Sequence, residues 1–131
     1  MNTTLVSARS SLGHVLVVDD DPKFTSIAVR TLERAGYRCT TGASGEQALR
    51  AAQDNPPDAI VLDLVMPRPN GIEVCDRLRT SGWAGGVIIV SARNGAADRA
   101  IAAAAGADAF LGKPFLLDDL VYAVDTLVRP L

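Results

Sequence analysis

The sequence predicts an α/β fold in which a five-stranded parallel sheet is doubly wound, with helices covering both of its faces. Short, wholly apolar runs rich in β-branched residues stand at 15–18, 59–62 and 87–90, as expected of strands that are buried on both faces. Segments with helical periodicity separate these runs, so strands and helices alternate along the chain. The 131 residues, 48% of them hydrophobic, contain no internal repeat and fit one domain with a single core.

The first predicted helix, at 23–35, has a characteristic residue at each end. Pro22 suits the first turn of a helix, where its missing N–H would have no partner, and Gly36 is a typical stop. We expect Ile27 and Leu32 to lie on the face of this helix that contacts the sheet.

Turn and cap residues mark the later elements. Ser44 followed by Gln47 resembles a capping box and predicts the start of a helix. Gly71 marks the turn before another helix, and Gly106 closes an alanine-rich one. The remaining strands are predicted at 37–40, 59–62, 87–90 and 110–111, and the remaining helices at 45–53, 72–80, 96–105 and 117–128.

The N-terminal residues differ in character from the rest of the chain. Residues 1–13 are rich in Ser and Thr and lack periodicity, so we expect a flexible tail there and a domain that covers 14–131. His14, the only histidine, is expected on the surface. We expect Trp83 to fill a gap in the packing rather than to bind a partner.

Composition excludes several classes of protein. A formal net charge of -2 and a pI near 5.2 argue against direct binding of nucleic acid. No signal peptide is recognisable and no apolar run is long enough to cross a bilayer, so we expect a cytoplasmic protein without membrane contact. Cys39 and Cys75 form no CxxC pair, and neither a disulfide nor a zinc framework is expected.

Polar residues stand at the ends of the predicted strands. Asp19 and Asp20 follow the first strand, Asp63 follows the third, Ser91 the fourth and Lys113 the fifth. Because the carboxyl ends of parallel strands share one edge of the sheet, where ligands bind in such folds, these side chains are expected to meet.

A cluster of three carboxylates needs a counter-charge. Ionised carboxylates within roughly 5 Å repel each other by several kcal/mol at an intermediate dielectric and raise one another's pKa. A hard divalent cation removes this penalty, and all-oxygen ligands favour Mg²⁺, with Mn²⁺ as a substitute. With a lysine and a hydroxyl ready to bind phosphoryl oxygens, the cluster predicts phosphoryl transfer.

Four segments resemble the signatures of bacterial response-regulator receiver domains, the CheY-like superfamily. They are VVDDDP at 17–22, VLDLVMP at 61–67, VSA at 90–92 and GKPF at 112–115. The resemblance covers roughly 14–129 and implies a flavodoxin-like (βα)5 fold. It also implies a phosphoprotein of two-component signal transduction that is not a turnover enzyme on external substrates.

The resemblance assigns a role to each residue of the cluster. Asp63 matches the phosphoacceptor, which takes the phosphoryl group from a sensor histidine kinase or a phosphotransfer protein. Asp19, Asp20 and Asp63, with the backbone carbonyl of Val65, match the ligands of the magnesium ion.

The resemblance also implies a switch. Lys113 matches the lysine that pairs with the phosphoryl group, and Ser91 matches the hydroxyl that moves toward it. Phe110 matches an aromatic switch residue, although a half-buried strand aromatic needs no such role. The bond before Pro114 is usually cis in this family, and Asp21 best fits a helix cap.

Two positions depart from the subfamily that is fused to winged-helix DNA-binding domains. Ala109 and Ala123 stand where that subfamily has Asp and Arg, so its charged dimer contacts would be missing. We expect a monomer or a weak dimer, either standing alone with a downstream effector protein or cut from a longer regulator with an output domain.

Two other functions compete with this interpretation. A pseudo-receiver would keep the fold and bind partners without phosphorylation, which the intact acidic and basic residues disfavour. A phosphatase with an aspartyl-phosphate intermediate would need a second aspartate two residues after Asp63, where this chain has Val65.

Overall fold

The computed structural model describes residues 11–129. The predicted tail at 1–13 therefore lies mostly outside the described residues, and its flexibility stays a prediction. Within the described part, the Leu12 N–H donates to the carbonyl of Gly36 at 2.9 Å, next to the start of the first strand.

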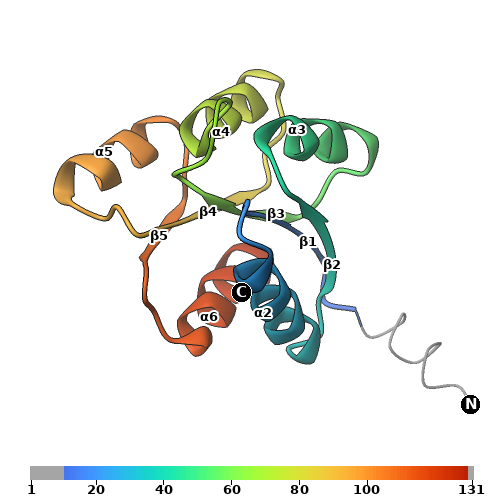
Figure 1. The fold of residues 1–131 in the computed structure, drawn as a ribbon. Helices are drawn as coiled ribbons and strands as arrows, with labels where there is room; N and C mark the ends of the chain where they lie inside the picture. The colour runs from blue at the N-terminus through green and yellow to red at the C-terminus, as the bar shows by residue number, and fades with distance from the viewer. Residues whose placement is uncertain (1–10, 130–131) are drawn as a thin grey trace, which may run out of the picture.

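Five parallel strands form one sheet in the order β2-β1-β3-β4-β5, which confirms the predicted fold class. Helices α3, α4 and α5 cover one face of the sheet, and α2 and α6 cover the other (Figure 1). The strands are β1 (His14–Val18), β2 (Arg38–Gly42), β3 (Ala59–Asp63), β4 (Gly86–Ser91) and β5 (Ala109–Gly112). The helices are α2 (Pro22–Arg34), α3 (Gly45–Asp54), α4 (Gly71–Thr80), α5 (Ala96–Ala104) and α6 (Leu117–Val128).

The central strands are apolar along most of their length because both of their faces are buried. Their polar residues, His14, Asp63 and Ser91, stand only at strand ends. In β1, Leu16 and Val18 belong to the core under α3, α4 and α5, whereas Val15 and Val17 belong to the core under α2 and α6. This alternation follows the two-residue period of a strand, and it divides the buried side chains into two layers.

Helix α2 begins as expected but presents a different inner face. Asp21 is its N-cap, and the carboxylate accepts the Lys23 N–H at 3.0 Å. Ala28 and Leu32 are fully buried, four residues apart on one face. The prediction for Ile27 was wrong: its side chain is half exposed, because it lies about 100° around the helix from Ala28.

Helix α3 starts at the predicted cap, with one change in its hydrogen bonds. The Ser44 hydroxyl accepts the Gln47 N–H at 3.2 Å, as a capping box requires. The Gln47 side chain, however, accepts the N–H of Ala43 at 2.8 Å instead of the N–H of Ser44.

A full capping box opens α4. Asn70 and Glu73 each accept the other's backbone N–H at 3.0 Å, so the helix starts one residue earlier than predicted, at Gly71. A Cβ atom on Gly71 would collide with the backbone carbonyl of Asp63. Glycine thus lets the helix start lie directly against the end of β3.

The surface position predicted for His14 was wrong, because β1 starts at this residue and lies between β2 and β3. Only 3% of His14 is exposed. Its ring Nε2 lies 2.7 Å from the hydroxyl of Thr40, and its backbone N–H donates to Asp58 at 2.8 Å. Burial, with the nearby charge of Arg38, lowers the pKa of His14.

Other isolated residues lie as expected. Trp83 packs against the core under α3, α4 and α5, and its indole N–H donates to the carbonyl of Pro57 at 3.0 Å. Cys39 and Cys75 are free thiols. Within residues 11–129, no helix has both the length and the apolar character needed to span a bilayer.

The two faces of α2 predict different responses to truncation. Leu32→Ala is expected to lower the free energy of unfolding by about 2–5 kcal/mol, since it leaves a cavity in a closed core. Ile27→Ala, on the same helix, should change it by less than about 1 kcal/mol. Urea unfolding followed by circular dichroism measures both, and equal losses would contradict this orientation of the helix.

Candidate functional site

Three aspartates meet at the carboxyl edge of the sheet. Asp19 directly follows β1, Asp63 is the last residue of β3, and Asp20 begins the turn into α2. One carboxylate oxygen from each of the three lies within 4.8 Å of the others. The sequence predicted this convergence from the residues at the strand ends. The cluster lies at the carboxyl ends of β1 and β3.

Asp19 is held from both of its oxygens. Its side chain is inaccessible to solvent; Oδ1 accepts the N–H of Asp21 at 2.8 Å and Oδ2 accepts from Lys113 Nζ at 3.0 Å. The backbone N–H of Asp19 donates to Gly42 at 3.2 Å. The carboxylate therefore has a fixed orientation before any ligand binds.

Asp63 is also mostly buried. Its Oδ1 accepts the N–H of Val65 at 3.0 Å, and its Oδ2 lies 3.5 Å from Lys113 Nζ. Burial raises the pKa of Asp63, and the charge of Asp19 adds to this, against the opposing effects of the Val65 N–H and the Lys113 ammonium. The ionised form of the Asp63 carboxylate would therefore be stabilised by a further positive charge nearby.

Lys113 connects the two buried carboxylates. Burial alone would lower the pKa of its ammonium, but the hydrogen bond to Asp19 and the charges of Asp63 and Asp19 raise it overall, so the group stays charged. The Lys113 N–H donates to the carbonyl of Ser91 at 2.8 Å, and the bond to Pro114 is cis, as the resemblance implied. The hydrogen bond between the Lys113 N–H and the Ser91 carbonyl connects the end of β5 to the end of β4.

One ammonium does not balance three carboxylates. Asp19 and Asp63 are both bonded to Lys113, while Asp20 is exposed and makes no ion pair in the described part of the chain. A hard divalent cation fits this all-oxygen donor set, and Mg²⁺ is the commonest ion of that kind in phosphate chemistry. Asp19, Asp20 and Asp63 are the side chains that could hold it.

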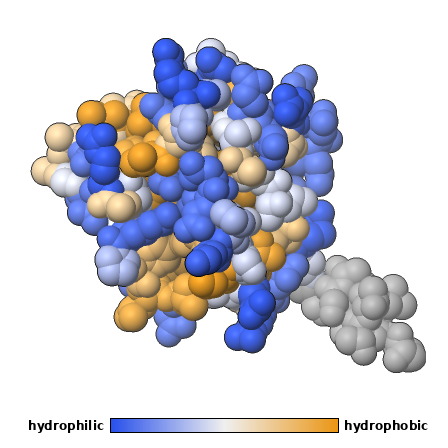
Figure 2. Space-filling model, viewed as in Figure 1, coloured by the Kyte–Doolittle hydropathy of each residue, from blue (hydrophilic) through white to orange (hydrophobic). Residues whose placement is uncertain are grey.

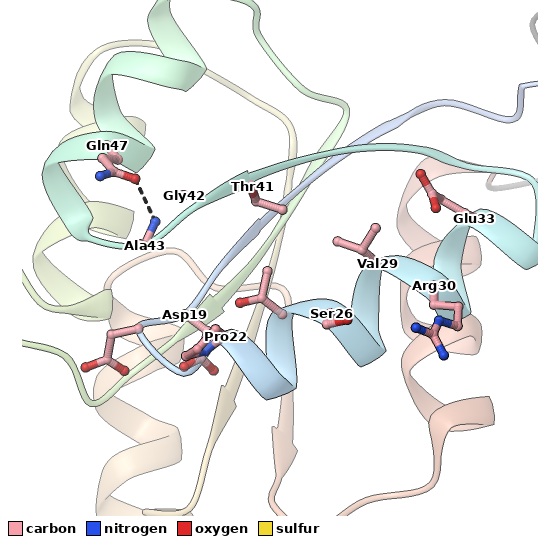
Figure 3. A pocket seen from close by; sticks show the side chains of 12 residues that line it. Asp19, Pro22, Ser26, Val29, Arg30, Glu33, Thr41, Gly42, Ala43 and Gln47 are labelled. Carbon is pink, nitrogen blue, oxygen red and sulfur yellow. Dashed lines mark hydrogen bonds between the residues drawn. The ribbon is translucent and has the colours of Figure 1, made fainter.

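A groove open to solvent borders the cluster. It runs between α2 and β2, with Asp19 at one end and Arg30 and Glu33 at the other (Figure 3). In the space-filling view, hydrophilic residues occupy the middle of the face that Figure 1 shows, and hydrophobic patches lie at its upper left and below (Figure 2). The groove reaches Asp20, which is exposed, whereas the Asp19 side chain beside it is inaccessible to solvent.

Ser91 lies beside the cluster but makes a different contact. It is the last residue of β4, and the residue before it, Val90, pairs with Asp63 of β3. Ser91 is fully buried, and its hydroxyl accepts the N–H of Arg93 at 2.9 Å. In this state the hydroxyl is engaged by the following loop and makes no hydrogen bond with Asp63 in the described part of the chain.

Phe110 is not part of the acidic cluster. It is partly buried against the core under α3, α4 and α5, and the guanidinium of Arg99 lies 4.8 Å from its ring centroid. Its predicted switching role stays a prediction. Sequence reasoning missed Phe24, whose ring contacts Lys113; its place in the first helical turn after the acidic run was the only signal.

Carboxylates and an ammonium at the carboxyl ends of parallel strands define a class of doubly wound α/β proteins suited to binding a cation together with a phosphoryl group. A family model described as the response regulator receiver domain matches residues 15–125. The chain belongs to this family, the receiver domains of two-component response regulators.

Known proteins resemble the chain over nearly its whole length. The transcriptional regulatory protein PrrA of Mycobacterium tuberculosis is 42% identical over 98% of the chain, and the chain spans only 53% of that protein. The Francisella response regulator 1452 receiver domain is 33% identical, with a TM-score of 0.85 over 89% of this chain and 97% of its own. The DrrB receiver domain, described as activated by BeF3, is 26% identical, with a TM-score of 0.80 over 86% of this chain and 94% of its own.

The raised pKa of Asp63 predicts that its ionisation opposes folding when no cation is present. With EDTA at pH 7, Asp63→Asn should therefore raise the free energy of unfolding. The native state binds this proton more tightly than the unfolded state, so the gain is full above the native pKa and vanishes below the unfolded value of about 3.9.

Urea unfolding between pH 4 and pH 8 measures this effect. Asp54→Asn removes an exposed carboxylate at the end of α3 and is the matched control, with little change expected. A loss of stability in the Asp63 variant at pH 7 would contradict the account of its environment.

Proposed function

We propose that Asp63 accepts a phosphoryl group from a phosphohistidine of a sensor kinase or phosphotransfer protein. The observation that carries this proposal is the position of the Asp63 carboxylate, which lies among two further carboxylates and one ammonium at the edge of the sheet. Membership of the receiver family, and the BeF3-activated state described for DrrB, support it.

The transfer is a displacement at phosphorus. An oxygen of Asp63 forms the new P–O bond while the P–N bond of the phosphohistidine breaks, and the imidazole nitrogen keeps the electron pair. Asp19, Asp20 and Asp63, with the Val65 carbonyl, would hold Mg²⁺, which neutralises charge on the phosphoryl oxygens when bound. The N–H of Val65 orients the attacking carboxylate by its bond to Oδ1.

Lys113 would stabilise the transferred group. Its ammonium already lies between Asp19 and Asp63, so the negative oxygens of a phosphoryl group on Asp63 would form close to it. A fixed cation placed where negative charge accumulates lowers the barrier without a large rearrangement. The lysine acts as an electrostatic partner and transfers no proton.

The phosphoryl group would shift the domain between two states. The acyl phosphate carries nearly two negative charges where the carboxylate carried one. Its oxygens would compete with Asp19 for Lys113, and they would accept a hydrogen bond from the Ser91 hydroxyl, which now accepts the Arg93 N–H. Movement of Ser91 and Lys113 toward the phosphoryl group would alter the ends of β4 and β5, and with them α5, α6 and Phe110. The shift is limited by the difference in interaction energy between the two states.

The output of this switch lies outside the described domain. The chain spans about half of PrrA, whose name describes a transcriptional regulator. We propose that the receiver controls either an output domain or a separate effector protein, and that it turns over no external substrate. Ala109 and Ala123 favour an output that does not depend on charged contacts between two receivers.

Replacing Asp63 tests the acceptor. Asp63→Asn is expected to abolish Mg²⁺-dependent labelling by acetyl phosphate, because the amide cannot serve as the nucleophile. Asp54→Asn should label like the wild type. The phosphorylated fraction is measured on a Phos-tag gel or by intact-protein mass spectrometry. Labelling of the Asp63 variant equal to that of the wild type would exclude Asp63 as the phosphoacceptor. Failure of the wild type to label or to bind beryllofluoride would favour a pseudo-receiver.

Variants of the adjacent residues Asp20 and Asp21 distinguish a metal ligand from a helix cap. Asp20→Asn should weaken Mg²⁺ binding about tenfold or more, since it removes a charged ligand. Asp21→Asn loses the same charge but keeps a good N-cap, so it should change the affinity far less. Calorimetry at low salt measures both, and an equal effect of the two would mean that only overall charge matters.

A further inference from the structure

We propose that Phe24 is a positioning residue for Lys113, and that its ring holds the lysine where phosphoryl transfer needs it. This inference rests on the proposed function. It assigns a role to a residue of α2 that lies outside the acidic cluster and has no ionisable group.

The contact is between a ring face and the charged end of the lysine. The ammonium of Lys113 lies 4.3 Å from the ring centroid of Phe24, well within the range of an attractive cation–π interaction. The same nitrogen lies 3.0 Å from Asp19 and 3.5 Å from Asp63. The ammonium is therefore restrained by two carboxylates and by an aromatic ring together.

A second aromatic ring holds the first. Phe115 meets Phe24 in an edge-to-face arrangement, with ring centroids 6.1 Å apart and planes at 78°. Phe115 is only two residues beyond Lys113, and both rings pack against the core under α2 and α6. The lysine and the ring that supports its aromatic partner thus belong to one short segment after β5.

The position of Phe24 depends on the same turn that builds the acidic cluster. The carboxylate of Asp19 accepts the N–H of Asp21, and Asp21 caps the helix turn that carries Phe24. A shift of this turn would move the carboxylates and the ring together. The turn after β1 therefore fixes the contacts of Lys113 with Asp19 and with Phe24 together.

This arrangement differs from the other two cation–aromatic contacts in the described residues, in which the cation is an arginine outside the acidic cluster. The guanidinium of Arg79 lies over Trp83 and also bonds carbonyls of neighbouring loops, which fits a structural role. At the Phe24 ring, the cation belongs to the candidate site itself. The ring restricts a long, flexible side chain that would otherwise sample many rotamers, and such restriction speeds a reaction that depends on positioning.

Kinetics of Phe24 variants test the role. Phe24→Leu keeps an apolar side chain but removes the ring, and we expect phosphorylation by acetyl phosphate at saturating Mg²⁺ to slow about three- to tenfold. Phe24→Tyr keeps the ring face and should retain most of the rate. Site-specific 3,4,5-trifluorophenylalanine keeps the shape but weakens the attraction for cations, so it should slow the reaction as the leucine variant does.

Two readouts do not depend on the reaction. Mg²⁺ affinity by calorimetry should stay within about twofold in all variants, because the side chain of Phe24 has no atom that could bind the ion. In the wild type, the ring current of Phe24 should shift the terminal methylene protons of Lys113 upfield in NMR spectra. Phe24→Leu should remove this shift while urea unfolding confirms that the variant is folded.

The outcomes separate this inference from the proposed function. A wild-type chain that takes no phosphoryl group overturns the proposed function, and the role of Phe24 with it. Normal labelling of the wild type with an unchanged rate in Phe24→Leu overturns only the role of Phe24. A slow leucine variant with an unaffected trifluorinated variant also overturns it, because shape alone would then explain the loss.

Discussion

Two buried carboxylates, Asp19 and Asp63, share the single ammonium of Lys113, and the rest of the edge is arranged around that imbalance of charge. Each carboxylate is oriented by a backbone N–H and shielded from water, so neither can relieve its charge by turning into solvent. A further cation is therefore bound favourably at this edge. The negative charge of a phosphoryl group on Asp63 can be stabilised only when such a cation is present. The parallel sheet makes this possible, because it brings together residues that are far apart in the sequence.

The fold and the acidic cluster follow from simple features of the sequence. Short apolar β-branched runs identify β1, β3 and β4, since strands buried on both faces have such composition. Once these strands are parallel, Asp19, Asp63 and Lys113 must lie at one edge, and their convergence is a consequence of topology. The predicted bounds differ from the observed ones by one or two residues where caps decide, as at Asn70 and Gly71.

Residues whose environment depends on packing between elements were beyond this reasoning. Ile27 and Ala28 are neighbours in sequence, and only the rotation of α2 on the sheet decides that the alanine is buried. His14 looks like a polar residue before a strand, yet the strands on either side bury it. Phe24 meets Lys113 only because α2 and the segment after β5 lie side by side at the edge, a contact that neither segment signals alone.

The most direct test of the central claim locates the phosphoryl group itself. The wild-type chain is treated with acetyl phosphate and Mg²⁺ and reduced with borohydride, which converts an aspartyl phosphate to homoserine. Peptides are then sequenced by mass spectrometry. The account predicts homoserine at position 63 and unmodified aspartate at 19 and 20. Homoserine at either of those positions, with position 63 unmodified, would contradict it.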